Sequence, residues 1–252
     1  MFIWDKLGSG TYHVFRVDRI WIKTASRFQQ ILICTLRDFG KALFLDGSLQ
    51  CAEADQALYH RALILPSLRV IREPKHILII GGGDGSAAYT VLAQKEVKVT
   101  MVELDEKVVE LSREYLPEFH HGVFENRDLE LIFMDGKDFM EKTNELFDIV
   151  VVDVTDPGVS KPSQTIYNKA FFKCVKDHLA QNGIMVTQAG SAWFTKQHFS
   201  EVGKLITQVF STVVPYGEFI HSFGSLWGFY IGTDSRQHDV YRALKDLGHS
   251  LL

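Results

Sequence analysis

The chain has 252 residues, of which 46% are hydrophobic and 23% charged, and its formal net charge is −4 at pH 7. These proportions are typical of a soluble globular protein. The negative balance argues against a nucleic-acid-binding protein, which needs a basic surface, and it is compatible with a cationic substrate. The length allows one α/β domain with a small appendage or two unequal domains.

Targeting and redox signals are weak in this sequence. No apolar run approaches the ~20 residues of a membrane span, and the first residues lack the basic and apolar regions of a signal peptide. Cys34, Cys51 and Cys174 are far apart and are interpreted as reduced thiols, neither disulfide-bonded nor metal-binding. We therefore expect a cytoplasmic protein with no membrane partner, no nucleic-acid partner and no metal site.

The segment from about Tyr12 to Leu49 has a strand-like pattern. Between Tyr12 and Leu49, apolar residues alternate with polar ones or form short runs bounded by turn residues. Turns are expected at Arg37–Gly40 and at Asp46–Gly47. We expect residues 1–52 to form a small antiparallel β domain. Because it is too small to be stable alone, it should pack on the larger domain or on a partner subunit.

A helix is expected from Glu53 to Leu65, because apolar residues recur at helical spacing, and Pro66 is expected to end it. This helix places Tyr59 and His60 beside one another near its start. From these residues alone, Tyr59 is interpreted as a half-buried aromatic side chain and His60 as a surface residue.

The segment His76–Glu103 combines an apolar strand, a glycine-rich turn, a helix and a second strand that ends in an acid. This order is typical of a nucleoside-binding βαβ unit. Gly81 and Gly83 belong to the turn, which lets the backbone approach a ligand at the N-terminus of the helix. Glu103 is placed to accept hydrogen bonds from ribose hydroxyls, or it caps the helix that follows.

Helices and strands alternate from this unit to the end of the chain. The expected elements are helix Glu106–Tyr115, strand Leu129–Phe133, helix Gly136–Thr143, strand Ile149–Val152, helix Tyr167–Leu179, strand Gly183–Gln188, helix Lys196–Phe210, strand-like VVPYG and WGFYIG, and helix Gln237–Leu247. The alternation predicts an α/β fold with a mostly parallel sheet, helices on both faces and an antiparallel edge. Residues 53–252 are expected to form this domain.

Acidic residues follow the expected strands, at the edge where open α/β sheets bind ligands. Asp84 in the glycine turn would repel a pyrophosphate or the carboxylate of S-adenosylmethionine and attract an ammonium. Asp153 and Asp156 either cap the next helix or join Asp84 in a negative pocket suited to a polyamine. A carboxylate placed there can accept the proton of an attacking amine. Asp135, followed by Gly136, either meets an adenine amino group or caps a helix.

Further motifs share the order found in one known family. They are S-R-F-Q at Ser26–Gln29, F-G-K-A-L-F-L-D-G-S-L-Q at Phe39–Gln50, E-A-D and Y-H within Glu53–His60, G-G-G-D-G at Gly81–Gly85, Glu103, Asp135 with Gly136, D-V-T-D-P at Asp153–Pro157, and Gln188. On these residues the chain resembles the polyamine aminopropyltransferases, the spermidine synthase family, over essentially its whole length. The resemblance implies a Rossmann-like, methyltransferase-type domain carrying a small N-terminal β domain, assembled as a homodimer or homotetramer.

The resemblance also implies a reaction and roles for residues. Decarboxylated S-adenosylmethionine, a co-substrate and not a resident cofactor, would give its aminopropyl group to a polyamine and leave 5′-methylthioadenosine. Asp153 would accept the proton, Asp156 would help to hold the acceptor, Asp84 would contact the donor's amine, and Tyr59 and His60 would line the amine channel. The implied donor-binding positions are Gln29, Gly81, Gly83, Asp84, Glu103, Asp135, Gly136 and Pro162. The loop from Asp153 to Thr165 would act as a lid.

Four positions depart from the commoner pattern of that family. Gln56 and Arg61 stand where acids are usual, and Tyr89 and Thr90 stand where an arginine and a glutamate are frequent. These changes are expected to remove negative charge near the amine channel, which argues against putrescine as the acceptor. A longer amine such as spermidine therefore stays open beside putrescine. Similarity to members that make thermospermine lies in the runs at Gly85–Ala88, Val186–Gly190 and Ser222–Gly228, with His221 in place of their usual proline.

Two other functions stay open at this point. A methyltransferase using S-adenosylmethionine could have the same fold, but Asp84 and the paired aspartates argue against it. A non-catalytic paralogue that binds a polyamine and regulates a partner subunit could carry Gln56 and Arg61, but it would not need both Asp153 and Asp156.

Overall fold

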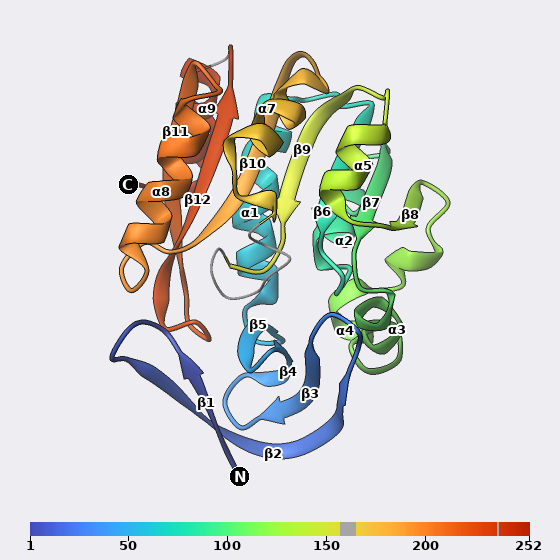
Figure 1. Cartoon of the computed structure of the whole chain (residues 1–252), viewed down its shortest axis with the longest axis vertical. Helices are drawn as coiled ribbons and strands as arrows, with labels where there is room; N and C mark the ends of the chain where they lie inside the picture. Colours follow the sequence, from blue (N-terminus) through green and yellow to red (C-terminus); the bar gives the residue numbers. More distant parts are fainter. Residues whose placement is uncertain (157–164, 236) are drawn as a thin grey trace.

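The structure is a computed structural model that describes residues 1–156, 165–235 and 237–252. Two sheets organise these residues. Figure 1 shows the smaller, N-terminal sheet at the end of the larger sheet toward which strand β9 points. The predicted domain boundary between residues 52 and 53 stays a prediction.

The N-terminal sheet is antiparallel throughout and follows chain order. Its strands are β1 (Phe2–Lys6), β2 (Tyr12–Ala25), β3 (Gln30–Leu36), β4 (Gly40–Leu45) and β5 (Ser48–Ala52). The expected turn at Asp46 and Gly47 is confirmed, with φ of 49° and 85°, and it pairs Leu45 with Ser48. Positive φ at both central residues is the geometry that a tight hairpin between twisted strands requires. Strand β1 was not expected from the sequence.

The larger sheet has the order β13-β11-β12-β10-β9-β6-β7-β8 within the described residues. Strands β10 (Leu179–Ser191), β9 (Phe147–Asp153), β6 (His76–Gly81), β7 (Lys98–Glu103) and β8 (Leu129–Phe133) are parallel. Strands β12 (Ser225–Thr233), β11 (Thr212–Ile220) and β13 (Ser250–Leu251) add an antiparallel edge. The predicted mostly parallel α/β sheet is confirmed. The carboxyl ends of β6, β7 and β9 therefore meet at one edge.

Alternating side chains of the buried strands pack against helices on the two faces. Ile77 and Ile79 of β6 face α1 (Gln56–Val70), α2 (Ser86–Leu92) and α9 (Gln237–Leu247). Leu78 and Ile80 face α5 (Gly136–Lys142), α7 (Lys169–Asp177) and α8 (Lys196–Thr207). A strand covered on both faces is apolar at every position, which is why β6 appears in the sequence as a continuous apolar run.

The small sheet docks on the larger domain through a core of its own. Ile31 and Leu43 of the small sheet pack with Val108 and Leu111 of α3 (Glu106–Tyr115), next to α4 (Pro117–His120) and a short 3-10 turn (Val123–Glu125). This contact places the ends of β1, β4 and β5 over the carboxyl edge of the larger sheet (Figure 1). The hollow between the two sheets is the site described below.

The expected end of the first helix at Pro66 is wrong. Helix α1 continues to Val70 with Pro66 inside it. Proline has no N–H to donate to the carbonyl four residues earlier, which is that of Ala62. The Tyr216 hydroxyl donates to the Ala62 oxygen at 3.0 Å instead. A tertiary contact thus replaces the missing helical hydrogen bond. This contact could not be predicted from the local sequence.

Candidate active site

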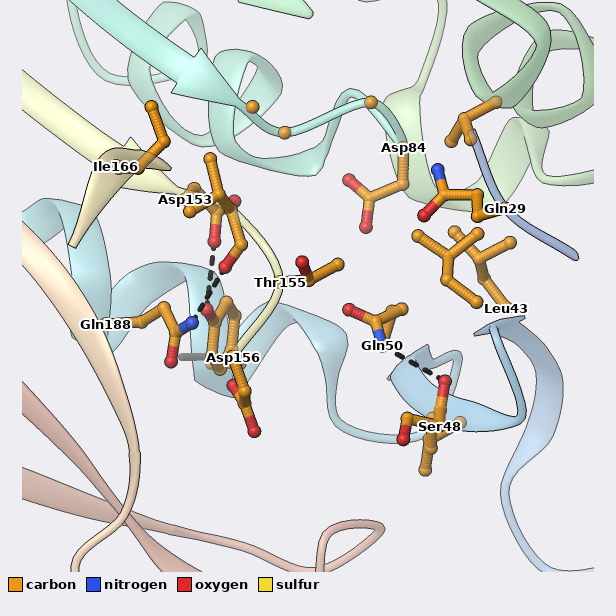
Figure 2. A pocket seen from close by; sticks show the side chains of 18 of the residues that line it. Gln29, Leu43, Ser48, Gln50, Asp84, Asp153, Thr155, Asp156, Ile166 and Gln188 are labelled. Carbon is orange, nitrogen blue, oxygen red and sulfur yellow. Dashed lines mark hydrogen bonds between the residues drawn. The ribbon is translucent and has the colours of Figure 1, made fainter. Parts of the chain in front are cut away.

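A hollow opens between the small sheet and the carboxyl edge of the large sheet. Its wall includes the ends of β6, β7 and β9, the start of α1, and residues of β1, β4 and β5. Figure 2 shows Asp84, Asp153 and Asp156 bordering this hollow, with Gln29 and Gln50 also on its wall. The prediction that residues 84, 153 and 156 share a pocket agrees with this placement.

Asp153 ends strand β9 and its side chain is 10% exposed. The Tyr59 hydroxyl donates to its Oδ1 at 2.9 Å, and its Oδ2 lies 3.9 Å from Nε2 of His60. Burial raises the pKa of Asp153 and the Asp84 charge raises it further, whereas His60 and the Tyr59 hydrogen bond oppose these effects. The carboxyl group is thus disposed to take up a proton.

Tyr59 and His60 lie one turn inside α1, and both are buried. Their residue-only interpretation as half-buried and surface side chains is therefore wrong. His60 donates from Nδ1 to the Gln56 carbonyl at 2.7 Å, because a carbonyl oxygen can only accept. Its Nε2 points between Asp153 and Asp84, at 3.9 Å from a carboxylate oxygen of each. One helix thus brings an aromatic hydroxyl and an imidazole to the two acids.

Asp84 is buried in the glycine turn between β6 and α2. Its Oδ1 accepts a hydrogen bond from the Ser86 backbone at 2.8 Å, which fixes the side chain where it borders the hollow.

Asp156 lies two residues beyond the half-buried Val154 on the same wall. Burial raises the pKa of Asp156 to about 7, an effect that a hydrogen bond from Gln188 opposes. Gln188 also donates to the Val154 carbonyl at 2.7 Å, and thereby ties the segment after β9 to β10.

The glycine turn approaches the acids so closely that side chains would not fit. Gly81 has φ of 89°, and an added Cβ would lie 2.1 Å from the Asp153 carbonyl oxygen. A Cβ on Gly83 would lie 2.9 Å from Oε2 of Glu103. Burial raises the pKa of Glu103 to about 7, and its Oε1 accepts from the Asp105 backbone at 2.9 Å.

Asp135 does cap a helix: its Oδ1 accepts from the Lys137 and Asp138 backbones at 2.8 and 3.3 Å, at the start of α5. Asp135 and Gly136 also line the hollow, so both interpretations of Asp135 fit the geometry. Gln29 lines the hollow and donates from Nε2 to Oδ2 of Asp105 at 2.9 Å. Pro162 and residues 157–164 of the expected lid lie outside the described residues.

Sequence reasoning missed several wall residues. Asp5 of β1 is buried on this wall, and burial raises its pKa to about 6, against hydrogen bonds from Leu49 and Ser48. Phe223 and Trp227, whose ring centroids are 4.5 Å apart, line it as well. A single acid in a short N-terminal strand carries no local signal. The likeness of Ser222–Gly228 to thermospermine-forming members was the one hint toward the aromatic pair.

The four departures from the family pattern lie elsewhere. Gln56, Arg61, Tyr89 and Thr90 all line a second hollow, between α1, α2 and α9, and none of them is on the wall of the acidic one. They therefore make no part of the wall around Asp84, Asp153 and Asp156, and the expectation that they remove negative charge near the amine channel stays a prediction.

Metal clusters and membrane-spanning helices are not found within the described ranges. No group of three or more His, Cys, Asp or Glu in residues 1–156, 165–235 and 237–252 is arranged to hold a metal ion. Over those same ranges, no helix has the length and apolar character needed to cross a membrane. All three cysteines are free thiols, with Cys34 and Cys51 buried.

Known proteins share both parts of this architecture. The family model described as spermine/spermidine synthase domain matches residues 56–242, and the one described as spermidine synthase tetramerisation domain matches residues 5–53. The polyamine aminopropyltransferase of Sulfolobus acidocaldarius is 37% identical over 88% of this chain and 74% of its own. That of Sulfurisphaera tokodaii is 39% identical over the same shares.

Solved structures agree on the fold. A spermidine synthase in complex with the transition state analogue AdoDATO has a TM-score of 0.89 at 24% identity, over 93% of this chain and 80% of its own. Spermidine synthase from Thermotoga maritima has a TM-score of 0.86 at the same identity and coverage. The chain belongs to the spermidine synthase family, as its motifs indicated, and it is a transferase.

Proposed function

We propose that this enzyme transfers the aminopropyl group of decarboxylated S-adenosylmethionine to an amine nitrogen of a polyamine and releases 5′-methylthioadenosine. The observation that carries the proposal is the convergence of Asp84, Asp153 and Asp156 on one hollow beside the glycine turn. Three carboxylates favour cations, and both proposed substrates carry ammonium groups. The relatives named polyamine aminopropyltransferase support the same reaction.

The donor is proposed to lie along the carboxyl edge of β6, β7 and β8. Glu103 accepts hydrogen bonds from the ribose hydroxyls, while Gly81 and Gly83 let the backbone approach the nucleoside. Asp135 accepts from the adenine amino group beside Gly136. Gln29, held by Asp105, completes this side. Pro162 is a proposed nucleoside contact on the family resemblance alone.

Asp84 is proposed to bind the terminal ammonium of the donor's aminopropyl chain. An ordinary S-adenosylmethionine would place a carboxylate there, against a buried acid whose side chain is already fixed by the Ser86 backbone. Two carboxylates in contact repel strongly in a site of low dielectric constant. The decarboxylated donor is therefore preferred.

Asp153 is proposed to remove the proton that the acceptor nitrogen must lose. Tyr59 occupies Oδ1, so Oδ2 is the oxygen offered to the substrate. The nitrogen lone pair attacks the methylene next to the sulfonium, a C–N bond forms, and the C–S electrons stay on sulfur as a neutral thioether. The proton from nitrogen passes to Asp153. The enzyme contributes alignment and this proton acceptor.

The acceptor is proposed to be putrescine or a longer amine such as spermidine, lying beside the carboxylates of Asp84, Asp153 and Asp156. Tyr59 and His60 contact the reacting end, and Asp156 holds the chain. Asp5 offers a further carboxylate on the same wall, and the Phe223 and Trp227 rings provide an apolar surface for methylene groups. A wall with both carboxylates and aromatic rings suits an amine that has several charged nitrogens joined by methylene chains.

Two further expectations are part of the proposal. The reaction uses no resident cofactor or metal, because the sulfonium itself is the activated electrophile. The enzyme works as a homodimer or homotetramer, which the match of residues 5–53 to a tetramerisation domain supports. Mass measurement in solution tests the assembly.

The experiment is product chromatography with decarboxylated S-adenosylmethionine and putrescine, cadaverine, agmatine, spermidine or spermine offered separately. We expect 5′-methylthioadenosine in equimolar amount with one new, aminopropylated amine. Methylated products from ordinary S-adenosylmethionine would replace the proposal with a methyltransferase. Release of no methylthioadenosine with any amine would indicate a non-catalytic binding protein.

A further inference from the structure

Asp55 occupies the residue before α1, where an aspartate ordinarily caps its own helix. Its carboxylate makes no such cap bond within the described chain. Instead, Oδ2 accepts from the Ser222 backbone at 2.7 Å and Oδ1 accepts from the Ser222 hydroxyl at 2.8 Å. Both residues are buried, Ser222 completely. A buried carboxylate is costly unless it is paired. The two hydrogen bonds therefore fix the position of Ser222 relative to Asp55.

Ser222 belongs to the turn between β11 and β12, which also carries Phe223. The turn is closed by a hydrogen bond from the Gly224 backbone to the His221 carbonyl at 3.0 Å. Phe223 is 5% exposed and borders the acidic hollow. Its ring lies 5.9 Å from that of Tyr59, edge to face. The turn thus contributes one aromatic wall of the hollow.

The other end of the contact leads to the reacting acids. The Asp55 carbonyl accepts from the Leu58 and Tyr59 backbones at 3.0 and 3.2 Å, so it forms the first turn of α1. The Tyr59 hydroxyl in turn donates to Asp153. The Asp55 and Ser222 contact therefore joins the element that carries Tyr59 to the element that carries Phe223, although 167 residues separate Asp55 from Ser222.

We propose that Asp55 and Ser222 are positioning residues that set the aromatic part of the amine site. They hold Phe223 against Tyr59, and so fix the width of the passage through which the acceptor's methylene chain reaches Asp153. Neither residue lines the hollow, so they act through the two rings. The inference rests on the proposed function in one respect, namely that the occupant of this passage is an amine.

The test is calorimetric binding of putrescine and of spermidine, each with 5′-methylthioadenosine present, which needs no turnover. Ser222→Ala removes one of the two hydrogen bonds and keeps the backbone donor. Asp55→Asn places an amide nitrogen where one of the two carboxylate oxygens accepts. The amine Kd of Ser222→Ala should rise about tenfold, which corresponds to about 1.4 kcal/mol. That of Asp55→Asn should rise at least as much.

The Kd of 5′-methylthioadenosine should stay within about twofold in each variant. The double variant should be close to Asp55→Asn alone, because both changes break one contact. The control is Thr233→Val, at the far end of β12. It removes a buried hydrogen bond to the Gly183 carbonyl, 3.0 Å long, without touching the turn. This control should lower the melting temperature and leave the amine Kd unchanged.

Three results would overturn the inference: an unchanged amine Kd in Ser222→Ala, equal weakening of amine and methylthioadenosine, or a Thr233→Val control that weakens the amine as much. A wild-type protein that binds amine but transfers nothing would overturn the proposed function alone, since the calorimetric comparison still decides the role of the pair. A wild-type protein that binds neither amine would overturn both.

Discussion

Replacing Asp153 by Asn tests the proton acceptor with little change of shape. The amide oxygen of the introduced asparagine can still accept the Tyr59 hydrogen bond, which is 2.9 Å long in the wild type. The change therefore falls on Oδ2, which lies 3.9 Å from His60 and is the oxygen proposed to meet the substrate. An amide nitrogen there can neither take up a proton nor attract an ammonium.

The loss should be large in turnover and small in donor binding. A positioned general base contributes about 10²- to 10⁴-fold to a rate, equal to about 3 to 5 kcal/mol in the activation free energy. The wild-type rate should also fall at low pH, because a proton on Asp153 blocks the acceptor role, and burial raises the pKa at which this happens. That limb should be absent from Asp153→Asn.

The assay is single-turnover release of 5′-methylthioadenosine across pH, with donor affinity measured separately. The matched control is Asp148→Asn, on the same strand but at its other end. Asp148 accepts from the Lys75 and His76 backbones at 2.7 and 3.0 Å, away from the hollow. This control should lose stability and keep its rate. A rate for Asp153→Asn within about threefold of wild type would remove Asp153 from the role of base.

Three further outcomes follow from the site. Burial raises the pKa of Glu103 to about 7 from an ordinary 4.5; the stability linked to its neutral form is complete below pH ~4.5 and is lost as pH rises through 7. Glu103→Gln should therefore raise the melting temperature of the ligand-free protein more at pH 8 than at pH 5, and equal shifts would contradict this. Asp5→Asn should raise the amine KM about tenfold at pH 8 with the donor KM unchanged, measured by steady-state kinetics; an unchanged amine KM would exclude Asp5 from the site. Gly81→Ala should lose at least ~2 kcal/mol more in denaturant unfolding than Gly122→Ala, which has a similar φ of 77° but open space around it, and equal losses would refute the close approach to Asp153.

The larger sheet could be predicted from the sequence because its signals are local. Apolar runs bounded by glycine and acids mark β6, β7 and β9, because strands covered on both faces are apolar at nearly every position. The rule that parallel strands present their carboxyl ends at one edge then brought Asp84, Asp153 and Asp156 together. That much of the site follows from strand order alone.

The remaining features depend on contacts between distant segments. Pro66 stays inside α1 because the Tyr216 hydroxyl satisfies the carbonyl of Ala62, 154 residues earlier in the chain. Asp5 reaches the hollow because β1 pairs with β2 and lies over the carboxyl edge. Neither contact leaves a mark in the nearby sequence. The local sequence also does not show that Arg61 lines the second hollow, because this depends on which side of α1 packs on the sheet.

The central claim is that the acids around the hollow select a donor that ends in an amine and lacks a carboxylate. The most direct measurement is the ratio of kcat/KM for decarboxylated over ordinary S-adenosylmethionine, in the wild type and in Asp84→Asn. We predict a wild-type ratio of about 100 or more, the size expected from a few kcal/mol of charge repulsion, and a clearly smaller ratio in Asp84→Asn. A wild-type preference for the ordinary donor, or a ratio that the substitution leaves unchanged, would contradict the account.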